Sequence, residues 1–379
     1  MYNTEPYKDF TLLVDGKAAF PEIISCIENA RRSVYINIFI WRDDNIGRRM
    51  GEAVLKAANN GASVYISVDR YGVVLEKSEE ARKSFFHKTQ TVAERLKSKI
   101  LSLGYPQNTP KGKFEDEESE LYKSIISHPK ITVSSHIFKA DHSKYYIIDD
   151  SILFMGGINI EDKENGQDVR GVSYGDYMVK MVGSTYVDAF KAKLTRGEDL
   201  DNSYIFGINS KEPNFPVFEI EKKYLDLINS AKVRLHITMA YFSPLDNFVN
   251  AIVSAYKRGV DVSIVIPSQA NYQDDTNKKT VKQLLKATNG GIRVYSSPRM
   301  LHTKLLATEE KITFGSANIT KKAFNQLSEL NLFVKNEECD FCKSVWDSID
   351  HDIKESKRIL SHKEIKYNRL YTLVEGQFI

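Results

Sequence analysis

The chain carries the stretch DHSKYYIID at residues 141–149, and FMGGIN follows at residues 154–159. His142 and Lys144 stand two residues apart, so in a β-strand their side chains lie on the same face. A lysine is a compact positive charge that suits a phosphate, and a histidine titrates near neutrality. The stretch therefore predicts a phosphate-handling site, with Gly157 and Asn159 at the end of the next short strand.

The same arrangement returns late in the chain, as HTK at residues 302–304 and FGSAN at residues 314–318. The surroundings repeat as well: IENA at 27–30 matches INSA at 228–231, and ANNGASVYI at 58–66 matches YKRGVDVSI at 256–264. The period is far longer than that of a solenoid repeat, so we infer a duplicated domain.

Length and composition agree with a duplicated globular chain. At 379 residues the chain exceeds one ordinary core, and we expect two domains, residues 1–200 and 201–379. The net charge of +3 is too small to indicate nucleic acid or an anionic membrane as partner. Three cysteines give no even disulfide framework.

The pattern of elements in each half predicts an α/β fold. Expected helices at 20–32 and 46–59 alternate with expected strands at 34–41 and 62–68, and the second half repeats this order between residues 218 and 266. Such strand–helix–strand units predict a mixed, mostly parallel sheet flanked by helices in each half. We expect residues 195–210 to cross between the halves and a long helix to run from about 340 to 360.

An insertion at about residues 73–130 interrupts the first half. It contains an expected amphipathic helix, and three interpretations of its apolar face are open: it docks on a membrane, covers the site, or packs on its own domain. The face consists of Phe85, Val92, Leu96, Ile100 and Leu103.

The sequence contains no apolar segment long enough to span a bilayer, and its first residues lack the pattern of a signal peptide. We therefore expect a cytoplasmic or peripheral membrane location.

Two copies packed about a pseudo-twofold axis would bring both motifs into one pocket, so a monomer would suffice for activity. One imidazole, of His142 or His302, would attack phosphorus, and the other would protonate the leaving oxygen. The phosphate oxygens would be held by Lys144, Lys304, Asn159, Asn318, Ser316 and Gly157. With two lysines supplying positive charge, we expect no metal and no other cofactor.

Each histidine also needs an acid that fixes its tautomer. Asp176 and Glu329 are the candidates, because each begins a strand at a similar distance after its motif. We expect Asp176 to lie behind His142, with His302 opposite.

These residues resemble the phospholipase D superfamily, in which His-x-Lys-x4-Asp followed by Gly-Gly/Ser-x-Asn occurs twice. The motif acids here are Asp149 and Glu309, and the resemblance implies that both are structural. It also implies a covalent phosphohistidine intermediate, with His142 as nucleophile and His302 as general acid and base.

Stretches outside the motifs are similar to bacterial cardiolipin synthases, namely IWRDDNIG at 40–47, DRYG at 69–72 and YFSP at 241–244. This resemblance implies a phospholipid substrate, with transfer of the phosphatidyl group to an alcohol or its hydrolysis. Trp41 and Tyr241 occupy matching places in the two repeats, either at the entrance of the site or in the core.

Two other functions are alternatives. A nuclease would cleave single-stranded nucleic acid with the same residues, and Glu309 favours it because some nuclease-like branches carry Glu there. An inactive binding module is the third alternative, and the intact His, Lys and Asn sets argue against it.

Overall fold

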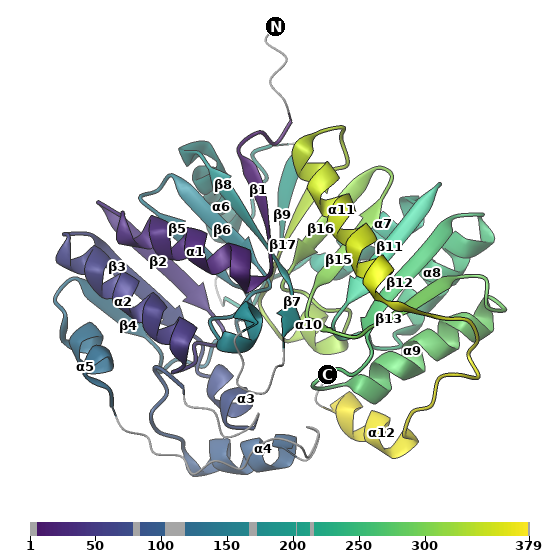
Figure 1. Ribbon diagram of the computed structural model, residues 1–379, viewed down its shortest axis with the longest axis horizontal. Helices are drawn as coiled ribbons and strands as arrows, with labels where there is room; N and C mark the ends of the chain where they lie inside the picture. Colours follow the sequence, from purple (N-terminus) through teal and green to yellow (C-terminus); the bar gives the residue numbers. More distant parts are fainter. Residues whose placement is uncertain are drawn as a thin grey trace, which may run out of the picture.

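The computed structural model describes residues 6–78, 84–102, 118–166, 173–201, 203–212 and 216–377. These residues form two large mixed β-sheets, one from each half of the chain, and a small two-stranded sheet between them (Figure 1). The α/β prediction is confirmed.

The first sheet has the strand order β1-β8-β6-β5-β2-β3-β4. Its strands are β1 (Phe10–Val14), β2 (Ser33–Ile38), β3 (Ser63–Val68), β4 (Ile131–Ser134), β5 (Tyr145–Ile148), β6 (Ile152–Gly156) and β8 (Tyr177–Val182). The helices of this half are α1 (Asp15–Glu28), α2 (Asn45–Asn59), α3 (Gly72–Ser78), α4 (Val92–Ser102), α5 (Glu120–Ser127), α6 (Ser184–Arg196) and the 3-10 turn η1 (Asp162–Asn165).

The second sheet has the order β10-β9-β17-β16-β15-β11-β12-β13-β18. Its strands are β9 (Tyr204–Ser210), β10 (Val217–Phe218), β11 (Arg234–Met239), β12 (Asp261–Pro267), β13 (Arg293–Ser297), β15 (Lys304–Thr308), β16 (Lys311–Gly315), β17 (Glu329–Lys335) and β18 (Lys357–Ile359). The helices are α7 (Ile220–Ser230), α8 (Asp246–Lys257), α9 (Asp274–Ala287), α10 (Lys321–Asn325), α11 (Asp340–Glu355) and α12 (Arg369–Gln377).

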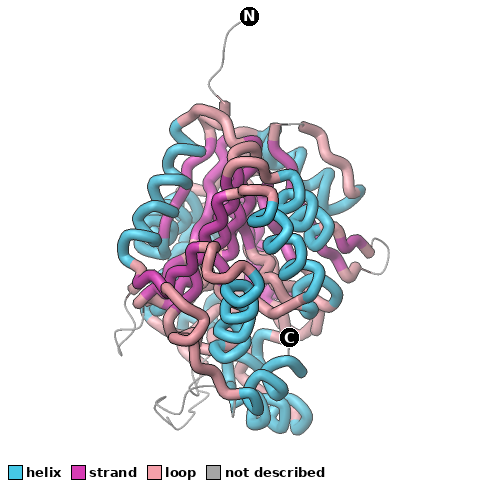
Figure 2. The backbone as a smooth tube through the Cα atoms, turned by 90° about the vertical axis from the view of Figure 1, so that its right-hand side faces the viewer, coloured by secondary structure: helices cyan, strands magenta, loops and turns pink. Residues whose placement is uncertain are grey.

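The two sheets pack face to face, with helices outside them (Figure 2). The shared core takes side chains from both halves, such as Leu153 and Met155 of β6 with Phe314 and Leu332 of the second sheet. The outer face of the first sheet packs against α1 and α2, and that of the second against α7, α8 and α9. Both faces of the central strands are therefore buried, which explains their continuous apolar runs.

The sheets are mixed, as predicted, but the expected parallel majority is wrong. Among the described strands of the two large sheets, only β2–β3, β3–β4, β11–β12 and β12–β13 pair in parallel. The motif strands form tight hairpins, β5 with β6 and β15 with β16, and hairpins are antiparallel.

Two further expectations need correction. Residues 204–210 of the expected crossing form β9, which pairs with β17 inside the second sheet. The expected C-terminal helix ends at Glu355, and residues 357–359 add an edge strand to β13. Along the chain, β8 is the last strand of the first large sheet and β9 is the first strand of the second. A domain boundary near residue 200 remains our proposal.

The insertion joins β3 to β4 through α3, α4 and α5, where the second half uses only α9 between β12 and β13. Phe85 does not belong to the helix face, because it lies before α4 and is buried against Trp41. Val92, Leu96 and Ile100 share one face of α4, but they are exposed, so the interpretation that this face packs on its own domain is wrong. Leu103 lies outside the described residues.

Within the described ranges, no helix combines the length and apolar character needed to cross a membrane.

Candidate active site

The two halves exchange backbone contacts directly beside both motifs. The strand β14 (Met300–Leu301) pairs in parallel with β7 (Tyr174–Gly175), and His302 N–H donates to the Gly175 carbonyl at 2.7 Å. Asp141 makes the corresponding parallel bridge to Ser328, and His142 N–H donates to the Ser328 carbonyl at 2.8 Å. Each histidine is therefore held next to the acid of the other half.

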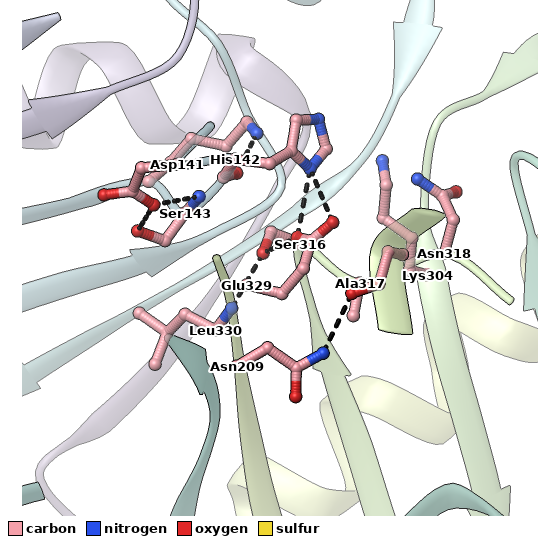
Figure 3. Close-up of polar contacts among 12 residues, drawn as sticks. Asp141, His142, Ser143, Asn209, Lys304, Ser316, Ala317, Asn318, Glu329 and Leu330 are labelled. Atoms are coloured by element: carbon pink, nitrogen blue, oxygen red, sulfur yellow. Dashed lines mark hydrogen bonds and ion pairs between the residues drawn. The ribbon is translucent and has the colours of Figure 1, made fainter. Parts of the chain in front are cut away.

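His142 pairs with Glu329 across the interface. Its Nδ1 lies 3.0 and 3.2 Å from the two carboxylate oxygens (Figure 3). The expectation that Asp176 lies behind His142 is wrong, because the halves face each other and each acid crosses to the opposite motif. The ring of Phe39 packs edge-on to the imidazole, with the ring centroids 4.8 Å apart.

His302 makes the reciprocal pair with Asp176, at 2.9 Å from Nδ1 to Oδ2. A second acid, Glu164 of η1, lies 3.7 Å from the same nitrogen. Neither Glu164 oxygen has a hydrogen-bond partner in the described part of the chain, and the side chain is buried. Burial, reinforced by the nearby acids Glu161 and Asp176, raises the pKa of Glu164 well above its usual value and so favours the protonated carboxyl.

Both lysines are fully buried beside the histidines. The ammonium of each donates to the backbone carbonyl of its own motif histidine, and Lys304 Nζ also lies 3.4 Å from Asp176. Lys304 lowers the pKa of His142, and Lys144 lowers the pKa of His302, so each lysine acts on both imidazoles. The structure thus brings the four residues into one electrostatic site.

Burial sets the protonation of the whole cluster. It lowers the pKa of both histidines well below the usual value, and the lysine charges lower it further. It raises the pKa of Glu329 to about 8 and that of Asp176 to about 6, in each case against the opposite effect of a lysine. It lowers the pKa of Lys144 to about 8. The site is therefore poised to exchange protons near neutrality.

The predicted phosphate contacts of Ser316 and Gly157 need correction. The Ser316 hydroxyl donates to Glu329 and accepts from Leu330 N–H, so it positions the acid (Figure 3). Gly157 N–H donates to the Tyr177 carbonyl, and a Cβ at this position would stand 2.2 Å from the Asp176 carboxylate. The glycine makes room for the acid, and the serine in the other copy holds its acid.

The two motif asparagines lie at the site. Asn318 lines the cavity described below, and its Oδ1 accepts from Tyr241 N–H at 3.2 Å. In the view of Figure 3 its amide group points in the same direction as the ammonium of Lys304. Asn159 is buried, and its Oδ1 has no hydrogen-bond partner among the described residues. These amides are suited to phosphate oxygens, and that role remains our proposal.

The motif acids turn away from this cluster. Asp149 accepts from the backbone N–H groups of Arg31, Arg32 and Ser33 at 2.7–3.1 Å. Glu309 accepts from those of Lys232 and Arg234 in the second half. The geometry favours a structural role for both, since each holds the turn that enters its central strand.

A cavity of about 110 Å³ opens onto His142. Its lining is mainly aromatic and aliphatic, and it is completed by Lys322, Asn318 and Glu329. The Lys322 ammonium of one half lies 4.5 Å from the ring centroid of Tyr71 of the other. Tyr241 belongs to this lining, whereas its counterpart Trp41 is buried in the core.

Residues 23–170 and 224–353 match the family described as cardiolipin synthase, PLD-like domain. The chain belongs to this family. The cardiolipin synthase-like chain is 24% identical over 400 residues to cardiolipin synthase 2 of Staphylococcus epidermidis, covering 99% of this chain and 75% of that relative. It is 26% identical over 377 residues to cardiolipin synthase of Clostridium perfringens, covering 91% and 70%. The predicted family is confirmed.

Solved structures share the fold of this cardiolipin synthase-like chain. Phosphatidylserine synthase of Haemophilus influenzae matches with a TM-score of 0.69 at 13% identity, covering 98% of this chain and 92% of that one. Polyphosphate kinase of Porphyromonas gingivalis matches with a TM-score of 0.56 at 10% identity, covering 97% and 52%.

Sequence reasoning missed Glu164 and Lys322. Glu164 follows Asn159 by five residues, but the matching position after Asn318 is Ala323, so the duplication did not indicate it. Tyr71, against which Lys322 packs, lies in the DRYG stretch directly after an expected strand, and this position could have indicated a residue of the site.

Proposed function

We propose that the chain transfers the phosphatidyl group of a phospholipid to an acceptor alcohol through a phosphohistidine intermediate, with water as a competing acceptor. The crossed pairs support it: His142 with Glu329 lines the cavity, and His302 with Asp176 belongs to the same electrostatic cluster. Two oriented imidazoles flanked by two ammonium groups supply a nucleophile, an acid and charge stabilisation together.

In the first half-reaction, Nε2 of His142 attacks phosphorus and the bond from phosphorus to the leaving alcohol breaks. His302 donates a proton to the departing oxygen. We assign His142 as the nucleophile because its imidazole lines the open cavity and its lowered pKa keeps the ring neutral. The reactive form is the one in which Glu329 has released its proton, so that Nδ1–H donates to the carboxylate and Nε2 carries the free lone pair.

The carboxylates stabilise the cationic rings that form. When phosphorus bonds to Nε2, positive charge develops on the His142 ring, and Glu329 compensates it at Nδ1. Asp176 does the same for protonated His302, and a substrate phosphate favours that protonation.

In the second half-reaction, neutral His302 accepts the proton of the acceptor hydroxyl, whose oxygen attacks phosphorus. The bond from phosphorus to His142 breaks, and the ring returns to its neutral form. Lys144 and Lys304 hold the phosphate oxygens throughout, so we expect activity to persist in a chelator such as EDTA.

A phospholipid fits the site better than nucleic acid does, because Leu75, Leu327 and Phe39 make much of the lining apolar. The likeness to cardiolipin synthases supports a phospholipid substrate. The phospholipid we propose is phosphatidylglycerol, because its glycerol hydroxyl groups can also serve as the acceptor alcohol.

The test is incubation with phosphatidylglycerol, with mass spectrometry of the lipid products. We expect diphosphatidylglycerol and free glycerol from the wild type, and a loss of at least about 10³-fold in His142→Ala. A rapid base quench and peptide mass spectrometry should find the phosphatidyl adduct on His142. Wild-type turnover in His142→Ala contradicts the mechanism, and cleavage of single-stranded DNA without any lipid turnover would establish the nuclease alternative.

A further inference from the structure

Helix α4 turns an apolar stripe away from the protein. Val92, Leu96 and Ile100 follow one another at four-residue spacing, so they line one side of the helix, and they are 83%, 60% and 43% exposed. The other side is anchored, because Leu101 is buried with Val73 and Val74 of α3, and the Ser98 hydroxyl donates to the Val74 carbonyl.

The stripe continues toward the mouth of the cavity. Ile137 and Phe138 are half exposed, and Lys97 of α4 lies 6.0 Å from the Phe138 ring centroid. Phe138 in turn packs edge-on to Tyr71, with ring centroids 5.0 Å apart, and Tyr71 lines the cavity that holds His142. A continuous path of side chains therefore joins α4 to the site.

The second half contributes to the same side of the molecule. Figure 1 shows α3 and α4 of the first half and α12 of the second along its lower edge. Leu370 of α12 is 73% exposed, and α12 packs on α9. A groove of about 500 Å³ beside it is lined by Lys279, Lys282, Lys286, Lys366 and Arg369.

The charge of α4 itself is positive. Arg95, Lys97 and Lys99 are exposed, and the single acid of the helix, Glu94, is bound to Arg70 at 2.8 Å. An exposed apolar stripe flanked by basic side chains is the composition of helices that lie in the interface of anionic bilayers. This exposed helix belongs to the insertion in the first half. The second half has α9 alone between β12 and β13, so it has no counterpart of α4 there.

We propose that this side of the molecule docks on an anionic phospholipid bilayer, with the mouth of the cavity facing the lipid. The docking face consists of Val92, Leu96, Ile100, Ile137, Phe138 and Leu370. The apolar side chains enter the acyl boundary, and the basic side chains of α4 and of the α9–α12 groove contact the headgroups. The inference rests on the proposed function, since a two-chain phospholipid has to reach His142 from a bilayer.

The experiment is sedimentation with vesicles of phosphatidylglycerol and phosphatidylcholine, compared with vesicles of phosphatidylcholine alone. The test variant is Leu96→Glu with Ile100→Glu, and the matched control is Val233→Glu. Val233 is 63% exposed and precedes β11, at the strand end opposite the site. We expect the double variant to bind mixed vesicles at least tenfold more weakly and the control to bind as the wild type does. Thermal unfolding checks that both variants fold.

A second pair of measurements separates docking from catalysis. His142→Ala should bind mixed vesicles like the wild type, whatever its turnover. The double variant should turn over dispersed short-chain phosphatidylglycerol within about twofold of the wild type but lose turnover on vesicles. Vesicle binding by a wild type that turns over neither lipid would overturn the proposed function and leave the docking face standing.

Three results would overturn the docking proposal. The first is undiminished vesicle binding by the double variant, and the second is no vesicle binding by the wild type. The third is sedimentation velocity showing that the stripe joins two copies, with a wild-type dimer that the double variant converts to a monomer.

Discussion

At the residue scale, each motif histidine is paired with an acid from the opposite half of the chain. The His-x-Lys pairs and both acids follow from strand periodicity and duplication. Which acid serves which histidine depends on how the halves face each other, and the paired residues lie 187 and 126 positions apart. Spacing within one repeat suggested the pairing inside each half, and the structure shows the crossed one.

The crossed pairs predict different defects for the two acids. With phosphatidyl-p-nitrophenol, whose leaving group needs no general acid, Asp176→Asn should keep the p-nitrophenol burst and accumulate the covalent adduct. Glu329→Gln should slow the burst by about 10³-fold, because His142 loses the acid that orients it. Stopped-flow absorbance measures both rates. Glu309→Gln is the matched control, because Glu309 is a motif acid that accepts from backbone N–H groups and does not pair with a histidine.

The same experiment can contradict the crossing. Peptide mass spectrometry locates the adduct on one histidine, and the acid whose loss slows the burst should come from the other half. A burst abolished by Asp176→Asn, with the adduct on His142, would mean that each acid serves its own half.

At the element scale, the sequence predicts best where periodicity and end signals agree. The order of β2, α2 and β3 follows from its apolar spacing and from Asn60-Gly61 after the helix. β9 was missed because its neighbour in the sheet, β17, lies more than a hundred residues away. The exposure of α4 could not be predicted for another reason. The spacing of apolar residues along a helix is the same whether that face packs on a core or on a lipid surface.

The start of α2 ties this reliable unit to the site. Asp44 accepts from Gly47 N–H at 3.0 Å as the N-cap and from Asp162 N–H at 2.8 Å. Asp162 in turn accepts from Ile46 N–H, so the cap fixes η1, which carries Glu164 beside His302.

Asp44→Ala should therefore lower the free energy of unfolding by about 1–2 kcal/mol. Urea denaturation measures it. Asp246→Ala is the control, because Asp246 is exposed in the first turn of α8 and makes no side-chain cap there, so its loss should cost well under about 1 kcal/mol. Equal losses in both variants would show that the Asp44 contacts add nothing beyond the helix dipole.

At the scale of the whole molecule, one core joins the two halves. Phe190 of α6 packs against Tyr145 of β5 and Phe206 of β9, with ring centroids 4.9 and 5.1 Å apart. Two such halves cannot separate without exposing this core and breaking both His–acid pairs, so the α/β layers and the site form together. The sequence predicted two copies of a domain, but the extent of their shared core follows only from the facing sheets.

The buried acids of this interface make the stability of the whole molecule depend on pH. The folded protein keeps a proton on Glu329 up to about pH 8, whereas an unfolded chain releases it near pH 4.3. Between about pH 6.5 and 8 the folded state binds more protons, so the free energy of unfolding falls as pH rises, by about 2 kcal/mol from Glu329 alone. Below that window the buried histidines act with the opposite sign, because their pKa is lowered on folding. Towards pH 8 Lys144 offsets a small part of the decline for the same reason, since its pKa is lowered to about 8. Urea denaturation at several pH values should show the decline, and Glu329→Gln should flatten it.

Glu309→Gln should leave the slope unchanged, because the pKa of Glu309 is lowered in the folded protein. A wild-type stability that rises from pH 6.5 to 8 would mean that Glu329 is ionised in the folded protein, paired with a protonated His142.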